Sequence, residues 1–196
     1  MEKIKSIILT VFLSIVWAAV NAHAATYTID PVHSTIGFAV KHLVVGTTRG
    51  DFEDYAGTIG FDGKDLASFS ADVVIQAKSI NTKNGDRDKH LRSADFLDVE
   101  NNPTITFKGK SLAAKGDGFE VTGDLMIHGV TKEVVIPAEI SGPVKSPFGD
   151  QVIGLAGEIT INRQDFGVSW NKTMDQGGLM VSDDVKIIVE IEAHQK

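Results

Sequence analysis

The sequence contains no cysteine and, beyond its N-terminus, no long hydrophobic run. Zero Cys among 196 residues excludes thiolate catalysis, cysteine metal ligands and disulfide bonds. The chain also lacks a cluster of basic residues, and its formal net charge is -7. An acidic chain of this kind binds nucleic acid phosphates and anionic lipid headgroups poorly, so we expect no nucleic acid partner.

The N-terminus has the three parts of a secretory signal peptide. Met1–Lys5 is short and basic, Ser6–Val20 is apolar and uncharged, and Ala22-His23-Ala24 forms a small-x-small cleavage site. The alternative is a retained membrane anchor, but the apolar run is shorter than the roughly 20 residues that span a bilayer. We therefore predict a signal peptide over residues 1–24, one domain over residues 25–196, a periplasmic location and no membrane span after cleavage.

The rest of the chain has the alternation that is typical of β-strands. Apolar residues recur at every second position in about eight runs, with polar residues between them. Turn signals separate the runs at Asp62-Gly63, Lys115–Gly118, Ser141–Pro143 and Pro147–Asp150. We predict an all-β fold, an antiparallel β-barrel of about eight strands, because closure removes the exposed edges of an open sheet.

One polar segment, Asn84–Ser93, interrupts the strand pattern. Asp88 and Arg92 stand four residues apart, and an ion pair at this spacing supports a short helix. The charged cluster Arg87–Asp95 (Arg87, Asp88, His90, Arg92 and Asp95) has two interpretations. It is either an acid–base site, of the kind that perturbed pKa values mark, or a loop held in place by its own ion pairs, which is the interpretation we favour.

The histidines show no local metal-binding pattern. His33, His42, His90 and His128 have neither the i,i+4 helical spacing nor the H-x-H strand spacing, so we predict no metal centre. We expect His33, beside Ser34, to cap a turn. His42 lies on the apolar face of its strand, where it either meets the polar head of a ligand or forms a buried, hydrogen-bonded side chain. No nucleophile elbow or phosphate-binding loop is present, and we predict no catalytic residue and no cofactor.

The predicted inner face mixes bulky residues with small ones. Gly57, Ala71, Gly123, Ala138 and Gly157 fall among Ile, Val and Phe on these faces. A barrel of about eight strands either packs solid or holds one small ligand. Small residues also occur where a barrel tapers or where a bulky neighbour fills the space. Periodicity alone leaves a ligand cavity and a packed core equally open.

Several motifs then occur in one order along the chain. They are Asp30–Ser34, Thr48–Phe52, Arg87–Asp98, Asn102–Phe107, Val121–Thr131 and Ile161–Gly167. In this order and spacing they resemble the YceI-like family of exported proteins, and the resemblance covers essentially all of the chain after the leader. It implies a lipocalin-like antiparallel barrel with a short helical insertion, a cavity for a polyisoprenoid chain, a periplasmic location and a homodimer. Leu97 departs from the family pattern, which often has a second aromatic residue there.

We therefore expect non-catalytic binding or carriage of a long apolar lipid, a polyisoprenoid or isoprenoid quinone. Trp170 and the stretch 174–180 form either the rim of the cavity mouth or an ordinary loop. Two alternatives stay open: an enzyme acting on an apolar substrate, with His42 or the Arg87–Asp95 cluster as acid–base groups, and a packed barrel acting as a stress or surface-interaction factor. The predicted cavity lining comprises Phe38, Val40, His42, Phe52, Ile59, Phe61, Val73, Ile75, Phe107, Leu125, Ile127, Val134, Ile136, Ile159, Ile161, Trp170, Ile187 and Val189.

Overall fold

Strands make up most of the computed structural model, which describes residues 24–173 and 179–195. Residues 1–23 of the predicted signal peptide and residues 174–178 of the predicted rim lie outside the described residues. The helical segments are α1 (Gly85–Arg92) and the 3-10 turns η1 (Leu66–Ser68), η2 (Ala77–Ser79) and η3 (Arg163–Phe166). The strands are β1 (Thr26–Ile29), β2 (Thr35–His42), β3 (Gly46–Phe52), β4 (Tyr55–Gly60), β5 (Ser70–Gln76), β6 (Ile80–Asn81), β7 (Thr104–Lys115), β8 (Gly118–Ile127), β9 (Val130–Lys145), β10 (Gln151–Asn162) and β11 (Val181–Gln195).

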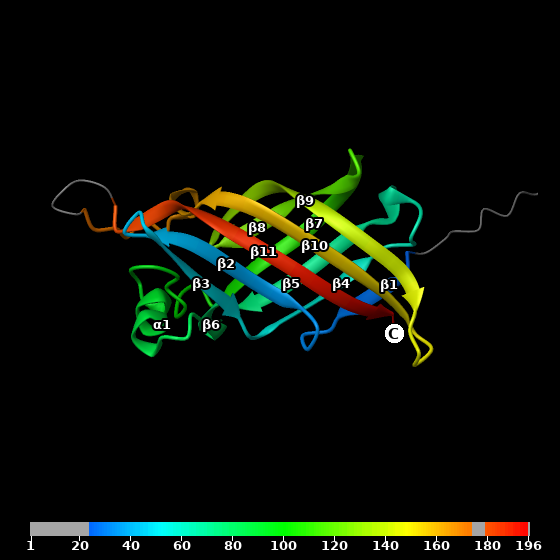
Figure 1. Cartoon of the computed structure of the whole chain (residues 1–196), viewed down its shortest axis with the longest axis horizontal. Coiled ribbons are helices and arrows are strands. Elements are labelled where there is room, and N and C mark those ends of the chain that lie inside the picture. The colour runs from blue at the N-terminus through cyan, green and yellow to red at the C-terminus, as the bar shows by residue number, and fades with distance from the viewer. Residues whose placement is uncertain (1–23, 174–178, 196) are drawn as a thin grey trace, which may run out of the picture.

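The sheet closes on itself because β1 and β2 lie end to end along one edge of β11. β11 pairs with β2 between Val181 and Glu190, and with β1 between Ala193 and Gln195. β3 and β4 likewise lie end to end. β3 pairs with β6, and β4 pairs with β5. The result is a closed antiparallel barrel of eight strand positions, which confirms the predicted fold class (Figure 1).

The turn predicted at Ser141–Pro143 is wrong. β9 continues through this segment to Lys145, and its pairing with β10 shifts register between Val152 and Gly154. Gly142 has a φ of +88°, so the segment forms a bulge that bends a long strand. A turn that was not predicted joins β8 to β9 at residues 128–129, and both of these residues have positive φ.

The polar segment forms helix α1, as predicted, but the predicted ion pair between Asp88 and Arg92 is wrong. Buried Asp88 accepts hydrogen bonds of 2.9 and 2.5 Å from the N–H and the hydroxyl of Thr82. Arg92 donates to the carbonyl oxygens of Lys78 and Ile80, at 2.7 and 2.6 Å. Each side chain has a partner outside the helix, and these bonds fasten α1 to β6 at one end of the barrel (Figure 1). In the described part of the chain, no helix is long and apolar enough to cross a membrane.

The small residues on the inner face are of two kinds. A Cβ added to Gly123 would lie 2.5 Å from the ring of Phe107 and 2.6 Å from the carbonyl oxygen of Lys108, so a bulky neighbour already fills that space. Ala71 and Ala138, in contrast, line an interior space. Gly123 therefore marks close packing, whereas Ala71 and Ala138 lie along the hollow part of the barrel.

Candidate functional site: the apolar interior of the barrel

Two apolar chambers follow one another inside the barrel. The first, of about 160 Å³, lies beside α1 and is named here the α1 chamber. The second, of about 100 Å³, lies further along the barrel and is named the far chamber. Along β11 the lining passes from Val185 in the α1 chamber to Ile191 in the far chamber. The wall residues common to both chambers, and hence the junction between them, are Ile36, Ile75, Leu125 and Ile187.

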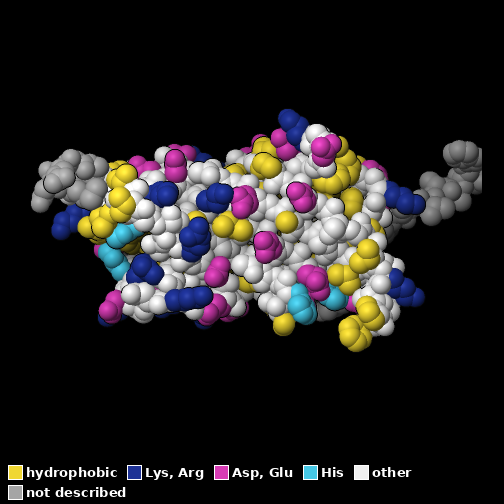
Figure 2. Space-filling model, viewed as in Figure 1, with side chains coloured by type: hydrophobic (Ala, Val, Ile, Leu, Met, Phe, Trp, Pro, Cys, Tyr) yellow, Lys and Arg dark blue, Asp and Glu magenta, His cyan; other side chains and the backbone are white. Residues whose placement is uncertain are grey.

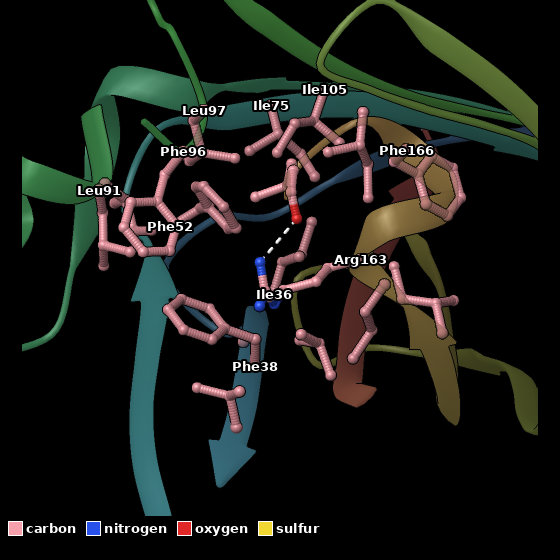
Figure 3. Close-up of a pocket in the computed structure, with 18 of the residues that line it drawn as sticks. Ile36, Phe38, Phe52, Ile75, Leu91, Phe96, Leu97, Ile105, Arg163 and Phe166 are labelled. Atoms are coloured by element: carbon pink, nitrogen blue, oxygen red, sulfur yellow. Dashed lines mark hydrogen bonds between the residues drawn. The ribbon is translucent and has the colours of Figure 1, made fainter. Parts of the chain in front are cut away.

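Segments outside the strands line the α1 chamber on two sides. Leu91 at the end of α1, with Phe96 and Leu97 just after it, points into the chamber, and Phe166 of η3 reaches in from another side (Figure 3). These side chains were not among the predicted lining, because strand alternation says nothing about helical segments. The signal available in the sequence was their apolar character within an otherwise polar stretch.

Trp170 was predicted to line the cavity, but it lies one layer behind the wall. Its ring centroid is 5.0 Å from that of His90 and 5.1 Å from that of Phe96. His90 Nε2 in turn lies 2.9 Å from Asp95 Oδ2. Edge-to-face and tilted aromatic contacts of this length stabilise the position of Phe96, so Trp170 shapes the chamber through its neighbour.

Arg163 brings a charge into this apolar wall. Its side chain is 6 % exposed, and its three nitrogens donate to the carbonyl oxygens of Ser182 and Val168 and to Asp183 Oδ1, at 2.9, 2.6 and 3.1 Å. Figure 3 shows Arg163 among the apolar side chains of the α1 chamber, with one of these hydrogen bonds as a dashed line. Burial lowers the pKa of Arg163, and the charge of Asp183 opposes that effect. A guanidinium carries five N–H donors, and these bonds use three of them.

Most of the predicted lining residues do face the interior. His42 does not, because β2 ends there and its side chain is exposed to solvent. Phe61, just beyond β4, packs into the core without facing either chamber, and Val134 on β9 packs against that core while partly exposed. The predicted residues that line one or both chambers are Phe38, Val40, Phe52, Ile59, Val73, Ile75, Phe107, Leu125, Ile127, Ile136, Ile159, Ile161, Ile187 and Val189.

The charged cluster Arg87–Asp95 holds α1 in place. Arg87 donates from Nε to Thr82 Oγ1 and from Nη2 to the Thr82 carbonyl oxygen, at 2.7 and 2.8 Å. With the bonds of Asp88 and Arg92 described above, most of these polar groups are used to fasten the helix. Across the described residues, the chamber walls include Leu91 of this segment but none of its charged side chains.

A closed antiparallel barrel with an apolar interior defines the class of this protein as a lipocalin-like barrel. The chain belongs to the YceI-like family, because a family model described as the YceI-like domain matches residues 27–193. It is similar to protein YceI of Escherichia coli, with 37% identity over 194 residues, which cover 98% of each chain.

Solved structures show the same fold. A Campylobacter jejuni YCEI protein superposes with a TM-score of 0.69 and 36% identity, covering 80% of this chain and 90% of that one. A polyisoprenoid binding domain from Saccharophagus degradans, implicated in plant cell wall breakdown, superposes with a TM-score of 0.63 and 15% identity, covering 88% of this chain and 99% of the domain. At 15% identity the second likeness concerns the fold alone.

Proposed function

We propose that this protein binds a long apolar lipid, a polyisoprenoid or an isoprenoid quinone, along the axis of the barrel and does not convert it chemically. The observation that carries the proposal is the hydrocarbon wall shared by the two chambers. Among the described residues that line them, Arg163 alone carries a charge, and its donors are largely engaged by protein oxygens. Such a wall suits a ligand that is recognised by its apolar surface.

The energetics favour a long chain. Transfer of a methylene group out of water contributes roughly 0.8 kcal/mol, so one five-carbon isoprene unit contributes up to about 4 kcal/mol before the cost of ordering the chain. Ordering and loss of translational freedom cancel much of that sum. A ligand of several isoprene units still binds firmly without a strong polar anchor.

The junction residues must move to admit such a ligand. Chambers of about 160 and 100 Å³ are each smaller than the roughly 300–1,000 Å³ of typical ligand pockets. Ile36, Ile75, Leu125 and Ile187 separate the two spaces, and new rotamers at these positions would join them into one channel. Arg163, the charged residue in the wall of the α1 chamber, would then lie beside the polar end of the ligand.

The comparisons support this assignment at the level of fold. The Saccharophagus degradans domain, described as polyisoprenoid binding, has the same barrel. A shared fold with a domain so described supports the proposal, and the apolar lining described above supplies the matching chemistry in this protein.

A matched pair of substitutions on β5 tests the proposal. Ile75 lies at the junction, while its neighbour Val74 faces outward and is 37 % exposed. We expect purified protein to bind a long-chain polyprenol with one ligand per chain, measured by native mass spectrometry and by displacement of a fluorescent fatty acid analogue. Ile75→Trp should weaken binding at least tenfold, and Val74→Trp should leave it unchanged.

Two results would overturn the proposal: no uptake of polyprenol, or equal uptake by both Trp variants. If Ile75→Trp fails to fold, as judged by circular dichroism, Leu125→Phe at the same junction takes its place. Incubation with the polyprenol, followed by extraction and chromatography, tests for conversion; recovery of altered lipid would favour an enzyme.

We also propose that residues 1–24 are removed during export to the periplasm and that the protein forms a homodimer there. Support for export comes from the basic, apolar and small-x-small segments of the N-terminus, and homodimerisation rests on the family resemblance. N-terminal sequencing of protein from a periplasmic extract should begin at Ala25. Sedimentation analysis of the same sample should give twice the mass of one chain.

A further inference from the structure

Two histidines and three carboxylates gather at the end of the barrel opposite α1. Asp30 and His33 lie in the turn between β1 and β2, Glu192 and His194 lie on β11, and Asp150 immediately precedes β10. Histidine side chains lie beside acidic ones on this part of the surface, near the C-terminus of the chain (Figures 1 and 2). The apolar interior does not involve these groups, and neither does the proposed lipid-binding function.

The backbone places the four side chains of the turn and of β11 side by side. The N–H of Asp30 donates to the carbonyl oxygen of Glu192 at 2.9 Å. The hydroxyl of Ser34 donates to that same carbonyl at 3.2 Å and accepts the N–H of Glu192 at 3.0 Å. Glu192 and His194 are two residues apart on one strand, so both point to the same face of the sheet. Closure of the barrel therefore brings the turn residues Asp30 and His33 beside Glu192 and His194 of β11.

The side-chain atoms of Asp30, His33 and Glu192 are spaced as the ligands of one small metal ion, and His194 lies next to two of them. Asp30, His33 and Glu192 each offer a ligand atom within 4.8 Å of the other two. His33 Nδ1 lies 2.7 Å from Asp30 Oδ2 and 3.7 Å from Glu192 Oε1, and His194 Nε2 lies 3.0 Å from Glu192 Oε1 and 3.9 Å from Asp30 Oδ2. Zinc bonds of about 2.0–2.2 Å in a tetrahedral site place ligand atoms about 3.3–3.6 Å apart, so binding would lengthen the short His33–Asp30 contact and draw the longer separations in slightly.

Asp150 would hydrogen-bond to one of the metal ligands, His194, and would not bind the ion itself. Its Oδ2 lies 2.6 Å from Nδ1 of His194, and its other carboxylate oxygen is bonded by the hydroxyl of Ser146. Metal-binding histidines commonly donate one ring N–H to a carboxylate, which leaves the other nitrogen free to bind the ion. In this arrangement the free nitrogen of His194 is Nε2, the atom that faces Glu192 and Asp30.

We propose that Asp30, His33, Glu192 and His194 bind one divalent transition-metal ion, with Zn²⁺ as the preferred ion. Two imidazole nitrogens with two carboxylate oxygens suit Zn²⁺, whereas Mg²⁺ and Ca²⁺ prefer sites made of oxygen ligands alone. The bound ion would join the β1–β2 turn to the C-terminal strand. β1 pairs with β11 through three residue pairs, Tyr27 to Ile29, so a metal cross-link at this short seam would strengthen the closure of the barrel.

Zinc titration of untagged, purified protein after treatment with EDTA tests the site. Isothermal titration calorimetry should give one Zn²⁺ per chain with a dissociation constant in the micromolar range or below, and no binding of Mg²⁺ under the same conditions. Zinc should also raise the midpoint of thermal unfolding. His33→Asn and His194→Asn should each weaken zinc binding at least tenfold.

His42→Asn is the matched control, because His42 is exposed at the opposite end of β2 and should leave zinc binding unchanged. The side chain of His33 is 62% exposed, so its variant should fold even if substitution of His194 disturbs the seam. The proposal is overturned if the native protein binds no zinc, or if His33→Asn and the folded His194 variant bind it as tightly as His42→Asn does. Because lipid uptake is not measured, failure here leaves the proposed lipid-binding function untouched.

Discussion

Arg163 donates a 2.6 Å hydrogen bond from Nη1 to the carbonyl oxygen of Val168, and both residues lie in the wall of the α1 chamber. Arg163→Met removes the charge but leaves this carbonyl, that of Ser182 and the carboxylate of Asp183 without their partner. We expect a loss of about 2–4 kcal/mol in the free energy of unfolding, measured by urea denaturation. Lys186→Met, which breaks an exposed pair with Glu158, should cost less than about 1 kcal/mol. Equal effects would contradict the structural role of Arg163.

Gly123 cannot accept a methyl group without a shift of its neighbours. A Cβ there would meet the ring of Phe107 and the carbonyl oxygen of Lys108 at 2.5 and 2.6 Å. We expect Gly123→Ala to destabilise the fold by about 1–3 kcal/mol. Gly85→Ala, in the open first turn of α1 where nothing lies within 4 Å, should be neutral or slightly stabilising. The midpoints of thermal unfolding of the two variants test this prediction. A Gly123→Ala variant as stable as the native protein would show that the space around Gly123 is not tightly packed.

Val44 stands in a backbone conformation that β-branched residues rarely adopt. Its φ is +65° in the turn between β2 and β3, and its side chain is 67 % exposed, so little packing offsets the strain. A left-handed conformation costs an ordinary residue roughly 1–2 kcal/mol, and Asn tolerates it better. We expect Val44→Asn to raise stability by about 1 kcal/mol in urea denaturation. Val45→Asn, at a neighbouring and even more exposed position, should change little.

Asp62 should make the stability of the turn after β4 depend on pH. Its Oδ1 accepts the N–H groups of Lys64 and Asp65 at 2.8 and 2.7 Å, and these bonds hold the pKa of Asp62 below its ordinary value of 3.8. A carboxyl whose pKa is lowered by folding stabilises the protein above the unfolded pKa, and that contribution is lost as the pH falls through the folded pKa. Asp62→Ala should therefore unfold at a lower temperature than the native chain at neutral pH. Calorimetry below pH 3 should show a smaller difference in unfolding temperature between the two proteins. A difference that does not change with pH would contradict the role given to Asp62.

The inner and outer faces of the strands were predictable because side-chain alternation is a local property of the backbone. Phe38, Ile75 and Leu125 line the interior as their positions in the alternation predicted. His42 shows the limit of that rule. The alternation predicts an inward side chain at this position, but the strand ends there and the side chain reaches solvent.

The remaining wall depends on how distant segments dock. Leu91 and Phe96 reach the α1 chamber because Arg92 bonds to carbonyl oxygens of residues 78 and 80, and no local pattern states where that helix lies. The histidine and carboxylate cluster at the end of the barrel opposite α1 also depends on the pairing of distant segments. Glu192 and His194 visibly share a strand face in the sequence, but only the pairing of β1 with β11 brings them to the turn that carries His33.

The central claim is that one long apolar chain occupies both chambers of the barrel. A crystal structure of the protein reconstituted with a long-chain polyprenol tests it most directly. We predict continuous electron density that runs from beside Phe96 in the α1 chamber, past a displaced Ile75, into the far chamber. Density for the lipid only on the outer surface, with both chambers and the junction unchanged, would contradict the claim.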